Sequence, residues 1–464
     1  MAGMNIQTRP AAVHPAPPPN PLLTARILPT LVRLAVPNAV ASIGATLVAI
    51  AETSYIGRLG TEPLAAIALV FPFVMLTQMM SAGAMGGGVS SAISRALGAG
   101  DQARAATLAV HAAIIGFGGG LLFTLVMLVF GAQLFALLGG SGGVLDQALT
   151  YSHVLFAGAA SIWMVNTLAS VLRGTGDMMR SSGVVLAVAL VQAIIGGVLG
   201  LGLGPIPRLG MAGVAAGQAI AFTLGALFLV WFIISGRSRI TLNFSSFAFQ
   251  RSMFFDILKV GAVSCLSPLQ TVLAILIFTK IVASFGPEAL AGYGIGARLE
   301  FLLVPIAFAL GVASIPMIGM AVGAKLIARA RQVAWTAGGL AGLLVGMIGL
   351  TVWISPDLWI GLFTQNEAVR GAARSYFAWA GAAYCWFGVG VCLYFCSQGA
   401  AKVGGPVIAG TARLVMVLAG GWWLASHGAE LWTLFALVAA SMTVYGVLTV
   451  LIVRGTSWGE AARA

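Results

Sequence analysis

The sequence predicts an all-α polytopic membrane protein with twelve transmembrane helices, arranged as two six-helix lobes related by a pseudo-twofold axis along the membrane normal. Three observations carry this prediction. Of the 464 residues, 59% are hydrophobic and only 8% are charged, so hydrocarbon must be the solvent for most of the chain. The apolar runs exceed the roughly 20 helical residues that cross a bilayer. An octapeptide at 98–105 recurs at 323–330, at an offset of 225.

Long apolar runs in lipid predict helices rather than strands, because backbone polar groups there must be hydrogen-bonded within their own segment. The expected spans are 30–57, 63–97, 105–131, 147–174, 178–202 and 209–236 in the first half, and 254–285, 288–322, 328–354, 368–398, 403–426 and 429–453 in the second. The expected domains are a disordered cytosolic tail (1–24), an N-lobe (25–236), a cytosolic linker (237–253), a C-lobe (254–455) and a C-terminal cytosolic tail (456–464).

The internal repeat extends beyond the octapeptide. GAGDQARA and GAKLIARA share five residues in register, and LGTEPLAA at 59–66 aligns with FGPEALAG at 285–292. A repeat unit of six spans keeps its orientation in the membrane, so the axis that relates the two lobes runs along the membrane normal. Duplicated membrane chains of this kind usually place their working site between the halves.

The distribution of cations predicts the orientation of the chain. Twelve spans place both termini on one side. We assign 18 of the 24 Lys and Arg residues to that side, counting Arg413 among them, five to the opposite side, and Arg298 to the interior of a span. Cationic loops translocate poorly, so we expect both termini in the cytoplasm and the protein in the inner membrane. A nucleic-acid partner is not expected, because the charges lie in short loops.

Several motifs resemble one known family. The first half contains AETSYIGRLGTEPLAAIAL, AISRALGAGD, VLRGTGDMMRSS and GLGPIPRLGMAGVAAGQAIA, and the second contains GYGIGARLEFLLVPIAFALGVASIPMIGMAVGA. Their order and spacing resemble those of multidrug and toxic compound extrusion (MATE) transporters over about residues 30–455. The resemblance implies a V-shaped pair of bundles that open alternately to each side. It also implies export of amphipathic, often cationic compounds, driven by inward H⁺ or Na⁺.

Two carboxylates lie inside the expected spans and are candidates for cation coupling. Glu52 lies in the outer third of the first span, where the resembling proteins usually carry Asp, and Glu300 matches a glutamate common among prokaryotic members. An ionisable group costs about 2.5–3.5 kcal/mol at the centre of a membrane helix, so chains retain few without a use. The alternative for Glu52 is a structural ion pair with Arg58. For Glu300, coupling and a purely structural role remain equally open.

The sequence also departs from the family. Many members carry Asn and Asp four residues apart in the fifth helix, where this chain has Gln192 and Gly196. The carboxylates that other members carry in the seventh and tenth helices are missing here, where the aligned positions fall near Gln270 or Thr271 and near Phe387. Coupling must therefore depend on Glu52, with Glu300 as a second candidate. We favour H⁺ over Na⁺, because a lone carboxylate among amides is a poor cage for Na⁺.

The candidate substrate-binding residues are polar, flexible or aromatic side chains in mid-span. Adaptable apolar walls with a few polar groups suit a site that accepts many amphiphiles. Mid-span amides must find partners inside the bundle or in a wet cavity. The candidates are Gln78, Met79, Asn166, Gln192, Tyr384 and Trp386. Ordinary helix packing or lipid contact is the alternative for the methionine and the aromatic residues.

Other classes of function are less well supported. GGSGG at 139–143 matches a hydrolase motif formally but lies in a short loop, and the four histidines pair with no nucleophile, so an enzyme is not expected. We expect no metal site and no cofactor. A flippase for lipid-linked saccharides is the alternative transporter, but it needs a strongly cationic cavity, and we place only Arg298 within a span. We expect a monomer in the lipid bilayer.

Overall fold

The computed structural model describes residues 20–240 and 249–459, and every regular element within them is helical. The elements of the first half are α1 (Pro21–Thr24), α2 (Ile27–Gly57), α3 (Thr61–Gln78), the π-helix η1 (Met79–Met85), α4 (Gly86–Gly98), α5 (Gln102–Leu137), α6 (Gly142–Ala157), α7 (Ala159–Gly174), α8 (Met178–Leu201) and α9 (Gly210–Ile234). Those of the second half are α10 (Arg251–Ala283), α11 (Pro287–Gly323), α12 (Ile327–Ile354), α13 (Asp357–Ile360), α14 (Glu367–Gly399), α15 (Gly404–Ser426) and α16 (Leu431–Gly455).

The helices agree with the expected spans to within a few residues, apart from the end of the third span and the start of the fourth. The third span, α5, ends at Leu137 instead of residue 131, and α6 begins at Gly142 instead of residue 147. Eleven segments among the described residues are long and apolar enough to cross a membrane, and a twelfth is obtained when α6 and α7 count as one span. These two helices meet at Gly158 at an angle of 49°. The second span is continuous but contains η1, which the hydropathy pattern did not predict. Single π-helical turns inside α-helices occur frequently at functional sites.

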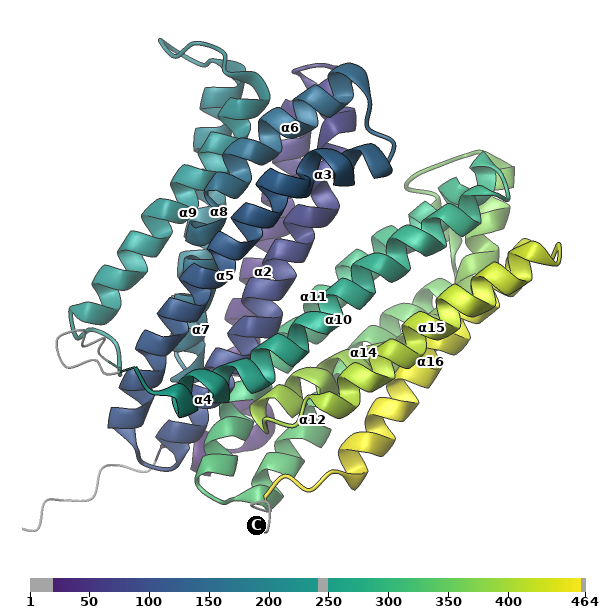
Figure 1. The fold of residues 1–464 in the computed structure, drawn as a ribbon. Helices are drawn as coiled ribbons and strands as arrows, with labels where there is room; N and C mark the ends of the chain where they lie inside the picture. Colours follow the sequence, from purple (N-terminus) through teal and green to yellow (C-terminus); the bar gives the residue numbers. More distant parts are fainter. Residues whose placement is uncertain (1–19, 241–248, 460–464) are drawn as a thin grey trace, which may run out of the picture.

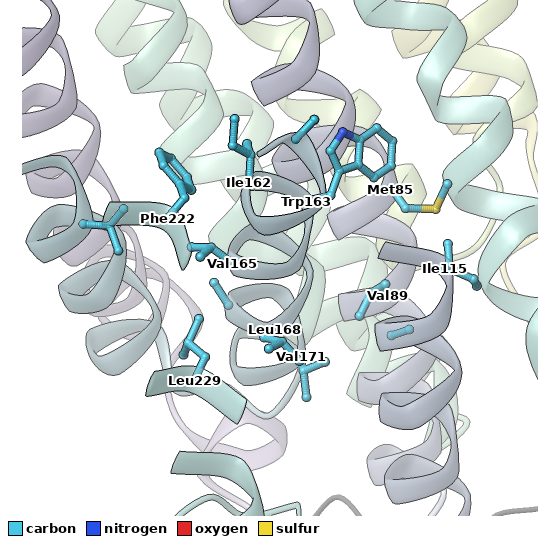
Figure 2. Packing of buried hydrophobic residues seen from close by; sticks show 14 of the residues in the cluster. Met85, Val89, Ile115, Ile162, Trp163, Val165, Leu168, Val171, Phe222 and Leu229 are labelled. Carbon is cyan, nitrogen blue, oxygen red and sulfur yellow. The ribbon is translucent and has the colours of Figure 1, made fainter. Parts of the chain in front are cut away.

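The two halves form two separate bundles (Figure 1). The first half, purple to teal, and the second half, green to yellow, lie close together at one end and diverge toward the other. At the centre of the first bundle lies α7, whose residues from Val165 to Gly174 are all buried. Figure 2 shows apolar side chains of α7 packed between α9 on one side and α4 and α5 on the other. The labelled residues are Ile162, Val165, Leu168 and Val171 of α7, Phe222 and Leu229 of α9, Val89 of α4 and Ile115 of α5.

The lobes touch where the repeated GA turns end α4 and α11. A Cβ atom added at Gly98 would lie 2.1 Å from the carbonyl oxygen of Met320, and one added at Gly323 would lie 2.1 Å from that of Arg95. Met320 follows Arg95 at the repeat offset of 225, so the two contacts are related by the pseudo-twofold axis. Residues without a side chain let two helix backbones approach this closely. The duplicated glycines therefore fix the end at which the lobes join.

The end of the N-terminal tail differs from the expectation where the structure describes it. Residues 21–24 form the helix α1 instead of a disordered tail, and the guanidinium of Arg329 donates to the carbonyl oxygen of Leu22. Near the other end of the chain, Trp458 is buried. The C-lobe begins at Arg251, three residues earlier than expected. Residues 1–19, 241–248 and 460–464 lie outside the described residues, and so does most of the predicted N-terminal tail.

Adding a methyl group at the crossing tests its tightness. We expect Gly98→Ala and Gly323→Ala each to destabilise the protein by about 1–3 kcal/mol, because the nearest atoms are backbone and cannot move aside without shifting a helix. Thermal unfolding of the purified protein in detergent measures the effect. Gly118→Ala is the matched control, since a Cβ there meets no atom within 4 Å. Equal melting temperatures for all four proteins would contradict the tight crossing.

Candidate functional site

A cavity of about 190 Å³ lies between the two lobes. Its N-lobe wall comes from α3 and η1, and its C-lobe wall comes from α10, α11, α14, α15 and α16. A smaller hollow of about 90 Å³ adjoins it and shares several of its lining residues. Most of the wall is apolar, with aromatic and methionine side chains that include Met75, Met79, Phe308, Phe387, Tyr394 and Phe395. Such a wall suits an apolar or aromatic compound.

Two charged side chains among the described residues line these two hollows. Arg413 lies in the middle of α15 and lines both hollows, and Glu300 of α11 lines the smaller one. The assignment of Arg413 to the cytoplasmic side is wrong, because Arg413 lies nine residues from the start of α15 and thirteen from its end. Arg298, which we had placed alone inside a span, instead stacks on Phe363 and is absent from both linings. The mid-membrane cation of the cavity is therefore Arg413.

The carboxylate of Glu52 lies inside the N-lobe and lines neither hollow. It is 8% exposed. Its Oε2 accepts a hydrogen bond from Gln192 Nε2 at 2.8 Å, and its Oε1 accepts one from the hydroxyl of Tyr151 at 3.2 Å. The alternative ion pair with Arg58 is not formed among the described residues. Amide and hydroxyl donors from α8 and α6 thus hold Glu52, and none of the described cations pairs with it.

Each lobe contains a carboxylate that accepts a hydrogen bond from a tyrosine, and Glu52 is buried whereas Glu300 is partly buried. The hydroxyl of Tyr151 donates to Glu52, and the hydroxyl of Tyr376 donates to Glu300. The two tyrosines are separated by the repeat offset of 225, whereas the two glutamates are not. The tyrosine donors therefore occupy equivalent positions in the two lobes, whereas the glutamate acceptors do not, since Glu52 lies on α2 and Glu300 on α11.

The predicted substrate residues fall into three places. Only Met79 lines the cavity. The amide of Asn166 donates to Gln78 Oε1 and to Ser81 Oγ, both at 2.8 Å, and links α7 to α3 and η1. As described above, Gln192 binds Glu52.

The two predicted aromatic residues of α14 lie elsewhere. Tyr384 is fully buried near Glu300 and Tyr376, but its hydroxyl forms no direct hydrogen bond among the described residues. Trp386 is 39% exposed and does not line the cavity, whereas its neighbour Phe387 does. Of the six candidates, the structure therefore brings Gln78 and Asn166 together near the cavity wall and leaves Trp386 apart from it.

The joined end of the lobes closes the cavity on that side through polar contacts. Asp256 of α10 accepts from Arg95 at 2.7 Å and from Arg104 at 3.0 Å, so an ion-pair network connects the lobes. The hydroxyl of Ser91 donates to the carbonyl oxygen of Gln398 at 2.5 Å.

Two repeat-related side chains reach the π-helix from opposite lobes. Arg173 donates to the carbonyl oxygen of Ala82 and Gln398 donates to that of Gly83, each at 3.3 Å. Because Arg173 and Gln398 are separated by 225 residues, equivalent positions satisfy neighbouring carbonyl groups of η1.

Reading the sequence missed three features of this site. The position of Arg413 was visible, since it lies well inside the span drawn at 403–426. The role of Asp256 was not visible, because its partners lie more than 150 residues away. The π-helix η1 has no signal in hydropathy, although the run of small residues at 81–88 marks a place where helices approach closely.

The fold and the cavity define a membrane transporter built from two repeated lobes. A family model described as MatE matches residues 37–199 and 264–423, which cover most of both lobes. The chain therefore belongs to the MatE family, whose members are multidrug and toxic compound extrusion transporters and not enzymes.

Curated relatives carry two kinds of name. The FAD transporter of Shewanella oneidensis is 29% identical over 315 residues, which are 67% of this chain and 69% of that protein. The multidrug export protein MepA of Staphylococcus aureus is 25% identical over 344 residues, or 74% of this chain and 75% of MepA. Among solved structures, a MOP superfamily transporter from Pyrococcus furiosus superposes with a TM-score of 0.86 at 24% identity, and 94% of this chain and 96% of that one are covered.

Removing the carboxylate that bridges the lobes should loosen the closed end. We expect Asp256→Asn to increase thiol labelling of a cysteine at the buried position Ser91, in a background without the four native cysteines. Partly exposed ion pairs contribute about 0.2–1 kcal/mol, so labelling should rise about two- to fivefold. The control is Asp177→Asn, which removes an ion pair with Arg180 inside one lobe. Equal labelling rates in both variants would contradict the bridging role.

Proposed function

We propose that this protein is a secondary active exporter that moves amphipathic small molecules across the bacterial inner membrane by proton antiport. The chain works as a monomer with both termini in the cytoplasm. The cavity between the lobes holds the substrate, and the lobes open alternately to the two sides. The observation that carries the proposal is the placement of Glu52, a buried carboxylate that faces only neutral hydrogen-bond donors and lies outside the cavity.

The surroundings of Glu52 favour H⁺ over Na⁺ as the coupling ion. Both of its oxygens accept from donors, namely the amide of Gln192 and the hydroxyl of Tyr151. Na⁺ needs several oxygen ligands that point at it, and donor groups repel it. A proton needs one oxygen only, and burial without a cationic partner makes the charged carboxylate costly enough for a proton to bind reversibly. Glu300 with Tyr376 is a second candidate for the same role.

The proposed outward direction of transport depends on which end of the lobes faces the cytoplasm. The basic residues that the positive-inside rule places in the cytoplasm include Arg95, Arg104 and Lys325, and they lie at the end where the lobes are joined. In this arrangement the lobes diverge toward the outer side of the membrane (Figure 1). Protonation of Glu52 from outside would favour release of substrate and reclosure.

The names of the relatives suggest which compounds to test first. MepA is named as a multidrug exporter and the Shewanella protein as an FAD transporter. FAD contains an aromatic ring system, and the aromatic and methionine wall of the cavity suits such a group. A flippase of lipid-linked saccharides is less well supported, because the linings of the two hollows contain a single cation.

The coupling role of Glu52 is tested by Glu52→Gln in proteoliposomes, with ethidium and FAD as fluorescent probes. The unaltered protein should move at least one probe when a proton gradient is imposed, and a sodium gradient alone should not drive transport. The variant should lose gradient-driven transport at least about tenfold, because an amide has the shape of the carboxylate but cannot bind and release a proton.

Glu288→Gln serves as the matched control, since Glu288 lies in the first turn of α11, outside both hollows. It should transport like the unaltered protein. Full proton-driven transport by Glu52→Gln would exclude Glu52 from coupling. Transport driven by sodium alone would exclude the proton as the coupling ion.

A further inference from the structure

Arg413 has an unusual environment for a guanidinium in mid-membrane. No carboxylate among the described residues lies within ion-pair distance of it, and its Nε atom is buried without a hydrogen-bond partner in that part of the chain. A cation inside a membrane protein is costly and normally pairs with an anion or a carbonyl group. Its partner is therefore expected to come from outside the chain.

The position of Arg413 decides where such a partner would lie. The side chain lines the main cavity and the adjoining hollow at once. Its guanidinium carbon lies 5.2 Å from the centre of the Phe387 ring, so a cation–π contact holds the planar group against one wall. A guanidinium fixed in this way still offers N–H donors to the cavity, in a geometry that matches carboxylate, sulfonate or phosphate oxygens.

The rest of the cavity fits the body of an aromatic anion rather than that of a cation. The one carboxylate of the lining, Glu300, already accepts a hydrogen bond from Tyr376 and belongs to the smaller hollow. Among the described residues, the lining of the main cavity includes no acidic side chain, and its wall presents the aromatic rings of Phe308, Tyr394, Phe395 and Tyr445. Glu300 acts on Arg413 electrostatically from the smaller hollow but forms no ion pair with it, so an organic cation in the main cavity would meet the guanidinium with no carboxylate in the same lining.

We propose that Arg413 binds an anionic group of the transported compound, so that the cavity selects amphipathic aromatic anions over the cations that the family resemblance led us to expect. This inference rests on the proposed function, in which the cavity between the lobes carries the substrate. It assigns the aromatic wall to the apolar body of the compound and Arg413 to its carboxylate, sulfonate or phosphate.

Two probes that share a pyrene ring and carry opposite charges test the assignment. Purified protein in phosphatidylcholine nanodiscs is titrated with 1-pyrenesulfonate and with (1-pyrenylmethyl)trimethylammonium, and energy transfer from the tryptophans reports binding. The unaltered protein should prefer the anion. Arg413→Met should weaken anion binding about 10- to 100-fold, because a charge-assisted hydrogen bond is lost, and should bind the cation at least as well as before. Arg413→Lys should retain part of the anion affinity.

Arg298→Met is the matched control, since Arg298 lies in a span but outside both hollows, and it should leave both affinities unchanged. Equal anion affinity in Arg413→Met and the unaltered protein would overturn the inference, and so would a preference of the unaltered protein for the cation. Either result leaves the proposed export function standing. Failure of both probes to bind would overturn the inference and also remove the cavity as the substrate site.

Discussion

The crossing of α4 and α11 determines the rest of this structure. Because Gly98 and Gly323 carry no side chains, two helix backbones from different lobes approach until each glycine contacts a carbonyl group of the other helix. The contact is duplicated by the internal repeat, and the network from Arg95 and Arg104 to Asp256 lies beside it. Lobes that are tied at one end and free at the other must enclose a space between them, and the cavity lies there.

The arrangement separates two chemical tasks. Glu52 is surrounded by N-lobe helices and has no access to the cavity wall, whereas Arg413 and Phe387 form part of that wall. A proton at Glu52 can therefore affect the substrate only by changing how the helices of the N-lobe pack. The helices that contact Glu52 directly through hydrogen bonds are α8, through Gln192, and α6, through Tyr151. Gly196, one turn beyond Gln192, allows the hydroxyl of Tyr55 to approach α8 closely.

The sequence predicted the scaffold better than the site. Span positions follow from hydropathy, and the paired lobes follow from a repeat that survives in the glycine turns, because both signals are local or periodic. Contacts between distant helices leave no such signal, so the bond from Asn166 to Gln78 and the bridge at Asp256 could not be foreseen. Arg413 was misplaced for another reason. Assigning every cation to one side of the membrane hides a cation inside a span, and Arg413 lies within the predicted span 403–426.

The central claim is that the two lobes close at one end while they open at the other, and that the cavity between them is thereby exposed to each side of the membrane in turn. Electron spin distance measurements test it most directly, with one label pair at Leu137 and Leu362 on the divergent end and another at Met179 and Leu326 on the joined end, all exposed positions. Between high and low pH, the account predicts that one distance shortens while the other lengthens, and that Glu52→Gln removes this response. Distances at the two ends that stay constant, or change in the same direction, would contradict it.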